Sequence, residues 1–469
     1  MKPALMLIPL LGGCVHSAGV TPETLPKAPE AYQNAGRGRG SKETPAIGRW
    51  WRVFKDRKLD ALMKQALEAS LTIEQAWARL SQARASLKLS RAGYWPTLSL
   101  KGEAGRSHTA MKFGEQQSSS FDRNTLSLSL AAAYEVDLWG KVRFGARAAR
   151  LELEASEDDV RAAYLSVAAQ LVESYFIAAE LRAQLQLLER TVESWRRHVE
   201  LVARRYREGV VTALDLYQAK QNLAAARAQQ HTIRRQLAST EHAICVLMGR
   251  APARGTAGAL RELPRQVVEL PPGLPAQLLL RRPDLAAAQR RLMAVDARVG
   301  QAVAGHYPSL TISGSVGYQF DPAALVWSIL GSLMAPIFEG QRVSAEVELR
   351  KAQLREALVG YRASLLRALA EVEDALVSGH ELGQRVRLLE ERVAAAEGAL
   401  RMSTDQYTQG LVSFLQVLTA EQSVYNARRE LLTARRELIS ARVQLARALG
   451  GGWMQEEMKR RTGSSGAES

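Results

Sequence analysis

The chain has few of the residues on which metal-dependent and redox enzymes depend. Its 469 residues include two cysteines and seven histidines. No two histidines have the HxxH or HExxH spacing, and no Cys/His cluster has the spacing of metal ligands. Phosphate-binding glycine loops and the GxSxG elbow of serine hydrolases are also absent. We therefore predict that the protein is not an enzyme and carries no metal or cofactor.

Cysteine is too rare to form a disulfide framework. Cys14 follows Lys2 and a short apolar run that ends in two glycines. A basic start, a short apolar stretch and small residues are typical of a secretory signal peptide, here residues 1–13. A cysteine after two glycines resembles a bacterial lipobox, in which Cys14 is lipidated and becomes the first mature residue. Cys245 then has no partner, so no disulfide is expected.

Long apolar runs are missing from the rest of the chain. No eighteen consecutive apolar residues occur, so no membrane-spanning helix is predicted. The formal net charge of +15 is compatible with nucleic-acid binding. Lys and Arg are, however, interspersed with Asp and Glu, and no module combines basic with aromatic residues. We attribute the charge to solvated helix faces and expect no nucleic acid partner.

The chain does contain its own pattern twice. The segment AGYWPTL at 92–98 returns as AGHYPSL at 304–310, and YREGVVT at 206–212 returns as YTQGLVS at 407–413. Both landmarks recur in the same order, each about 200 residues later. Two landmarks of different type at nearly the same separation predict two structural repeats.

Each repeat holds a long segment whose apolar residues recur in alternating steps of four and three. The first row comprises Val202, Val199, Trp195, Val192, Leu188, Leu185 and Leu181, and the second comprises Leu400, Ala396, Val393, Leu389, Val386 and Leu382. A spacing of 3.5 residues predicts helices that wind around partner helices. No proline interrupts residues 141–208, and a helix of that length extends on the order of 100 Å.

Other segments alternate with a period of two. One face carries Leu126, Leu128, Leu130, Leu310, Ile312 and Val316, and the other carries Ser127, Ser129, Thr311, Ser313 and Ser315. Residues 98–101 and, less regularly, 325–335 are further strand candidates. A transmembrane barrel strand requires such alternation, although a half-buried soluble hairpin also shows it. Pro96 and Pro308 mark the change from helix to strand.

A sheet that spans a membrane must close on itself, because an open edge leaves backbone groups unpaired in hydrocarbon. Four strands in one chain cannot close a barrel, whereas two chains supply eight strands and three chains supply twelve. If the strands enter a membrane, the protein is therefore an oligomer.

These patterns divide the chain into two repeats with flanking segments. We predict a signal peptide at 1–13, a lipidated linker at 14–45, repeat 1 at 46–249, a linker at 250–275, repeat 2 at 276–450 and a disordered tail at 451–469. In repeat 1 we expect the strand pair at about 97–137, the long helix at about 141–208 and the return helix at about 213–248. In repeat 2 we expect them at about 309–335, 341–409 and 413–449.

Four groups of residues together resemble the TolC-like outer membrane factors, in the NodT-type lipoprotein branch of efflux systems. They are WWxxFxDxxL at 50–59, LLRRPDL at 279–285, the paired proline segments and the paired Tyr-x-x-Gly turns. The resemblance implies a mainly α fold with a small membrane β-barrel portion. In that family a homotrimer forms a twelve-stranded barrel in the outer membrane and a periplasmic α-helical barrel.

The resemblance also implies a function. It is a passive exit duct for drugs or metal ions, engaged by a periplasmic adaptor protein and an inner-membrane transporter of RND type. The expected location is the cell outer membrane, with a lipid anchor at Cys14 and a periplasmic extension. Val15 is compatible with export to that membrane.

The resemblance assigns site residues as well. The adaptor-docking tips are Gly209, Val210, Val211, Thr212, Gly410, Leu411, Val412 and Ser413, and the periplasmic gate residues are Tyr206, Asp215, Tyr407 and Gln416. Family members close the tip with acidic residues shortly after the glycine. Asp215 has this position, but Gln416 replaces the acid in the second repeat, and Val412 stands where some members carry arginine. We therefore expect closure by hydrogen bonds and apolar contacts.

Two other functions are compatible with the sequence. The same fold serves as the outer membrane component of type I protein secretion, although the lipoprotein branch favours small molecules or metal ions. From a different class, a soluble coiled-coil interaction protein with two β-hairpins and no channel would show the same periodicities. Single-channel conductance distinguishes a channel from such a scaffold.

Overall fold

The computed structural model describes residues 29, 32–34, 48–113, 117–256, 258, 260, 262–264, 281–321 and 323–465. Cys14, the predicted signal peptide and most of the two predicted linkers lie outside the described residues. The chain divides into two compact units. Unit 1 contains mainly residues 79–157 and 287–363, and unit 2 contains mainly residues 48–78, 158–286 and 364–465.

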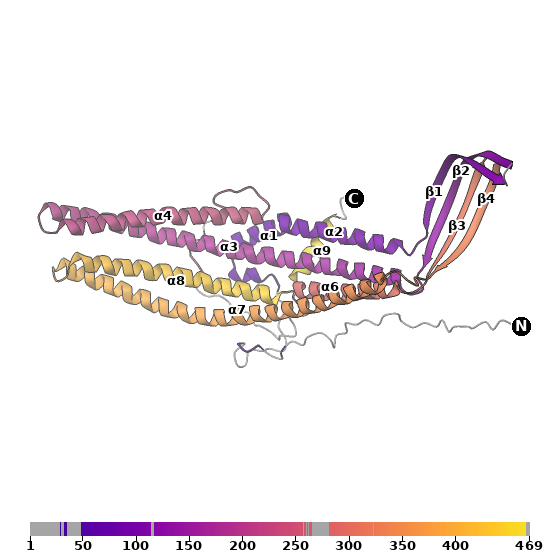
Figure 1. Cartoon of the computed structure of the whole chain (residues 1–469). Helices are drawn as coiled ribbons and strands as arrows, with labels where there is room; N and C mark the ends of the chain where they lie inside the picture. Colours follow the sequence, from indigo (N-terminus) through magenta and orange to yellow (C-terminus); the bar gives the residue numbers. More distant parts are fainter. Residues whose placement is uncertain are drawn as a thin grey trace. The chain divides into compact units, whose positions relative to one another are not determined.

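The order of elements along the chain repeats itself (Figure 1). The elements are η2 (Trp50–Phe54), α1 (Arg57–Ala69), α2 (Leu71–Ala92), β1 (Thr97–Phe113), β2 (Gln117–Val136), α3 (Lys141–Arg207), α4 (Ala213–Leu247), α6 (Pro283–Ala304), β3 (Ser309–Phe320), β4 (Ala323–Met334), α7 (Arg342–Thr408), α8 (Phe414–Leu449) and α9 (Trp453–Ser465). Helix, strand pair, long helix and return helix occur twice, and both long helices, α3 and α7, have 67 residues. The predicted fold class, mainly α with a small sheet and a duplicated order, is confirmed.

The four strands lie side by side in unit 1 as one antiparallel sheet, in the order β1-β2-β3-β4 (Figure 1). One row across the sheet consists of Leu100, Leu130, Val316 and Trp327. The next row on the opposite face consists of Lys101, Ser129, Gly317 and Val326. The predicted alternation thus gives the sheet one apolar face and one face of mostly small or polar residues. Strand β4 is apolar on both faces, which explains its less regular pattern, and β1 and β4 are the two edges.

In unit 2 the apolar rows of the long helices are buried. Residues Leu181, Leu188, Val192 and Trp195 of α3 pack with Leu223, Ala226 and Ile233 of α4 and Tyr425 of α8. Residues Val386 and Leu389 of α7 pack with Leu431 and Ala434 of α8. Each long helix therefore winds beside its own return helix, as the 3.5-residue spacing predicts. Tyr425 adds a contact between the two repeats.

Helix α3 is the one helix, within the described part of the chain, that is long and apolar enough by composition to cross a membrane. The apolar stretch of 18 residues that meets this criterion is 61% buried inside the structure. A core helix passes the same test of length and composition, so this feature is weak support for a membrane span.

Arg282 and Asp284 of the LLRRPDL motif join the start of α6 to α7 and α8 in unit 2. Arg282 is only 8% exposed and donates hydrogen bonds to Asp284 at 2.8 Å and Glu371 at 2.7 Å. Arg282 also donates to the carbonyl of Ala448. Burial raises the pKa of the Asp284 carboxyl, but the hydrogen bond and charge of Arg282 outweigh burial and hold this pKa below its usual value. Arg282 and Asp284 thus have a structural role.

The C-terminal segment differs from the prediction. The disordered tail predicted at 451–469 is wrong over the range of α9. Trp453 and Met454 are 2% and 1% exposed, and the Trp453 ring lies 4.9 Å from the ring of Trp51, edge to face. The helix is short, mostly polar and buries mainly its first turn, so it lacks the long periodicity that identified the other helices. The adjacent apolar residues Trp453 and Met454 were the available sequence signal for a buried segment here.

Candidate functional site

Both helical hairpins of unit 2 reverse at a glycine. Gly209 has a φ of 72° and Gly410 a φ of 75°. The N–H of Gly209 donates to the carbonyl of Tyr206 at 3.0 Å. The N–H of Val210 donates to the carbonyl of Arg205 at 2.9 Å, and the second turn repeats both bonds. This is a Schellman motif, in which glycine relieves the strain of a positive φ. A Cβ at either glycine would meet open space, so backbone conformation alone requires glycine.

The residue after each glycine is apolar and exposed. Val210 is 66% exposed and Leu411 is 70% exposed. In the first turns of the return helices, Leu214 and Leu415 are 64% and 53% exposed. Exposed apolar side chains gathered at one place are typical of a surface that contacts another molecule. They occur at the same position in both repeats.

The two return helices begin differently. The Asp215 carboxylate accepts hydrogen bonds from the N–H and the hydroxyl of Thr212 at 3.0 and 2.8 Å. The N–H of Asp215 donates back to the Thr212 hydroxyl, which completes a capping box. Ser413 makes no such side-chain bond, and the N–H of Gln416 donates to its carbonyl instead. The predicted gate residues Asp215 and Gln416 are therefore not equivalent. Asp215 caps the start of its own helix, α4.

The two tyrosines of the Tyr-x-x-Gly turns also have different surroundings. Tyr206 is 44% exposed. The Tyr407 hydroxyl accepts a hydrogen bond from the guanidinium of Arg205, whose Cζ lies 4.8 Å from the centre of the tyrosine ring. The ring of Phe414 lies 5.3 Å from that of Tyr407. Tyr407 thus links α7 to α3, and Arg205 is a partner that the sequence analysis missed.

More contacts join the repeats beneath the tips. Val202 of α3 is completely buried and packs with Phe414 and other apolar residues of α8. One turn before Val202, the Nδ1 of His198 lies 3.0 Å from a carboxylate oxygen of Glu421. Both side chains are largely buried, at 23% and 11% exposure. The sequence analysis did not find this pair, because its members come from different repeats.

A buried carboxylate lies earlier in α3, farther from the hairpin tip. Glu180 is 6% exposed and accepts hydrogen bonds from Thr433 at 2.7 Å and Arg436 at 2.9 Å, both on α8. Such partners offset the cost of burying a charge. The two repeats are therefore joined by polar as well as apolar contacts.

A groove of about 480 Å³ lies between α4 and α8 in unit 2. Its lining is rich in side-chain amides, namely Gln218, Gln221, Asn222, Gln422 and Asn426. Amides both donate and accept hydrogen bonds. The groove therefore suits a polar face of a partner helix.

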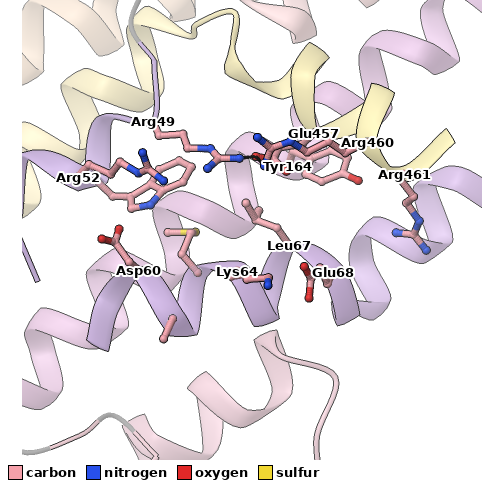
Figure 2. A pocket seen from close by; sticks show the side chains of 13 residues that line it. Arg49, Arg52, Asp60, Lys64, Leu67, Glu68, Tyr164, Glu457, Arg460 and Arg461 are labelled. Carbon is pink, nitrogen blue, oxygen red and sulfur yellow. Dashed lines mark hydrogen bonds and ion pairs between the residues drawn. The ribbon is translucent and has the colours of Figure 1, made fainter. Parts of the chain in front are cut away.

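A second hollow of unit 2, of about 770 Å³, lies among η2, α1, α3 and α9. Figure 2 shows the side chains that line it. Arg49 forms an ion pair with Glu457 there, and more basic than acidic residues line the hollow. No Ser, Cys or His is among its described lining residues, so no Ser–His or Cys–His pair lies among them. In the described ranges of the chain, no group of three or more His, Cys, Asp or Glu could hold a metal ion.

The chain thus combines two long helical hairpins with a two-faced antiparallel sheet. It belongs to the outer membrane efflux protein family, whose model matches residues 62–250 and 274–451. It is an outer membrane channel component of an efflux system. The predicted family and outer membrane location are confirmed.

Particular relatives match nearly the whole chain. The cation efflux system protein CusC of Escherichia coli O6:H1 is 28% identical over 438 residues, 92% of this chain and 91% of CusC. The pyoverdine export outer membrane protein OpmQ of Pseudomonas putida is 29% identical over 469 residues, 97% of this chain and 99% of OpmQ. The solved structure of the outer-membrane channel OprN matches with a TM-score of 0.85 at 27% identity, covering 94% of this chain and 100% of that one.

Proposed function

We propose that three copies of the chain form a passive exit duct for small molecules or metal ions, lipid-anchored at Cys14. A periplasmic adaptor and an inner-membrane transporter of RND type would deliver the cargo. One observation carries the proposal. The four-stranded sheet has an apolar face, a mostly polar face and two unpaired edges.

The apolar face is exposed in the single chain. Leu98 and Leu100 of β1 are 69% and 70% exposed, and Trp327 and Ile329 of β4 are 69% and 77% exposed. In water such a face is unfavourable, whereas a barrel in lipid requires it. Because only a closed sheet is stable in hydrocarbon, β4 of one copy pairs with β1 of the next.

The strand lengths fit this placement. A barrel strand crosses the bilayer with roughly 9–11 residues. Strands β3 and β4 have 12 residues each, whereas β1 and β2 have 17 and 20. The first hairpin therefore extends beyond the bilayer on the side away from the helices. Three copies of four strands give the twelve-stranded barrel that the family resemblance implies.

The hairpin tips at 209–212 and 410–413 are the proposed docking site for the adaptor. The exposed Val210 and Leu411 supply apolar contacts. The two glycines have no Cβ and allow a partner helix to approach the backbone closely. The amide-lined groove between α4 and α8 adds hydrogen-bonding groups beside the tips.

Closure of the duct is proposed to depend on contacts between the repeats near the tips. Tyr407 with Arg205, and Val202 with its apolar neighbours on α8, hold the two hairpins together. Asp215 contributes a negative charge in each copy, but its carboxylate is engaged by Thr212. Hydrogen bonds and apolar contacts therefore replace an ionic latch.

The proposed cargo is small. CusC is named for cation efflux and OpmQ for pyoverdine export, so relatives of this chain serve both kinds of small cargo. This favours efflux over type I protein secretion.

Export from cells tests the proposal. Deleting the gene should raise the intracellular level of a fluorescent dye, and the full-length chain should restore export. Leu411→Asp should abolish restoration at an unchanged amount of outer membrane trimer. Leu388→Asp, at a comparably exposed position of α7, is the matched control and should restore export. Normal export by the Leu411 variant would refute docking at the tip, and absence of outer membrane trimer in the wild type would refute the duct.

A further inference from the structure

An aromatic stack joins the end of β2 to the start of β3. The rings of Trp139 and Tyr307 are stacked, with centroids 4.9 Å apart and planes 27° apart. The indole N–H of Trp139 donates to the carbonyl of Pro308 at 2.7 Å. All three residues lie in the linkers between helices and strands, so the stack fixes how the two strand pairs meet.

The other two linkers of the chain are repeat counterparts of these. Leu138-Trp139-Gly140 after β2 corresponds to Ile337-Phe338-Glu339-Gly340 after β4, with one extra residue before the glycine. Both glycines have a positive φ, 82° and 58°. Before the strands, Trp95-Pro96 corresponds to Tyr307-Pro308. Phe338 is thus the counterpart of Trp139, and Trp95 is the counterpart of Tyr307.

These counterparts do not meet within one chain. Phe338 is 88% exposed and Trp95 is 75% exposed. They lie beside β4 and β1, the opposite edges of the sheet. A hollow of about 620 Å³ lies beside Phe338, lined also by Trp139 and Met334. A large aromatic side chain from outside the chain has room there.

We propose that Phe338 of each copy stacks on Trp95 of the neighbouring copy, which repeats the junction of Trp139 with Tyr307. The occupant is a second copy of this chain, because closure of the barrel already brings β4 and the next β1 together. The inference rests on the proposed trimer and specifies the contact and the strand register at its boundary.

The register follows from the same correspondence. Within the chain, Val136 lies opposite Leu310. Val136 is three residues before Trp139, and Leu310 is two residues after Pro308. The equivalent positions at the boundary are Ala335 and Leu98 of the neighbouring copy. Met334 then lies opposite Ser99, and Leu333 opposite Leu100.

The faces of the strands give an independent check of this register. Leu333 and Leu100 both belong to the apolar face, because Leu333 pairs with Leu310 and Leu100 pairs with Leu130. Met334 belongs to the opposite face with Ser309. A slip by one residue would place apolar-face residues of one copy beside polar-face residues of the next. The register derived from the linkers avoids this mismatch.

Disulfide cross-linking tests the register in the full-length protein. The pair Ser99→Cys and Met334→Cys should form covalently linked dimers and trimers on oxidation, since directly opposed strand residues have Cα separations that suit a disulfide. The slipped pair Leu98→Cys and Met334→Cys is the control and should remain monomeric on a non-reducing gel. Linkage of the slipped pair in preference to the first would overturn the register.

A second pair keeps the test decisive if the first variant fails to insert. Lys101→Cys and Ser332→Cys occupy the same register two residues farther along and should also link. Neither single variant should give cross-linked species. Conducting trimers in which neither register pair links would refute the inference and leave the channel standing, whereas absence of trimers in the wild type would refute the proposed function.

A double-mutant cycle tests the stack itself. Trp95→Ala and Phe338→Ala should each lower the temperature at which the trimer dissociates by several degrees, and the double variant should fall no further than the lower single. Trp327→Ala, on the apolar face of β4, is the control and should add its effect independently to either. If the Trp95 and Phe338 effects are additive, each ring lies separately in the headgroup region of the membrane and the stack does not exist.

Discussion

Replacing Leu130 with arginine should prevent the sheet from entering the outer membrane, whereas Ser129→Arg should be tolerated. Leu130 of β2 lies in the apolar row with Leu100 of β1 and Val316 of β3. Val316 is close to the middle of β3. Ser129 is its neighbour on the opposite face and lies opposite Gly317. The two variants differ by one position in the strand and carry the same new charge.

The magnitude follows from the depth of the position. An arginine on the lipid face near mid-membrane costs about 2–4 kcal/mol in each copy, so three copies lose about 6–12 kcal/mol per trimer. This is comparable to the whole stability of a typical domain, about 5–15 kcal/mol. On the water-filled side the same residue remains solvated, and we expect a loss within about 1 kcal/mol.

The assay is the fraction of heat-modifiable trimer in isolated outer membranes, supported by urea titration of refolding into lipid vesicles. Leu130→Arg should give little trimer and Ser129→Arg nearly the wild-type amount. Equal losses, or a greater loss for the Ser129 variant, would show that the apolar face does not meet lipid.

Three further outcomes are expected. Cys14→Ser behind an ordinary signal peptide should lose acyl labelling but still form trimers, because the helices and barrel supply the assembly energy; loss of trimers would contradict this. Gly410→Trp should abolish dye export at normal trimer content, because the strain at φ 75° is local to the tip; normal export would contradict docking there. The lowered pKa of Asp284 means that its ion pair with Arg282 stabilises the fold above the usual carboxyl range and is lost as the pH falls through that lowered pKa. Asp284→Asn should therefore lower the urea midpoint at pH 7 and flatten its decline in acid, and an unchanged acid decline would refute this.

Features with a local cause could be predicted from the sequence. The alternation around Leu130 fixed the two faces of the sheet, and Gly209 and Gly410 marked the hairpin turns. The capping role of Asp215 also had a local signal, its spacing of three from Thr212, but the family resemblance drew attention to the gate instead.

Features that depend on packing between the repeats could not be predicted in the same way. Arg205 with Tyr407, and His198 with Glu421, join residues about 200 positions apart in the chain, and periodicity gives no information on which helices meet. Helix α9 was missed for another reason, because it buries mainly the first turn of a polar segment.

Single-channel conductance of the purified full-length protein tests the central claim, a passive duct, most directly. In a planar lipid bilayer without nucleotide, the wild type should give discrete conductance steps. Arg205→Ala, which removes the hydrogen bond to Tyr407, should give larger or longer steps. Inserted trimers that conduct no ions in either form would contradict the account.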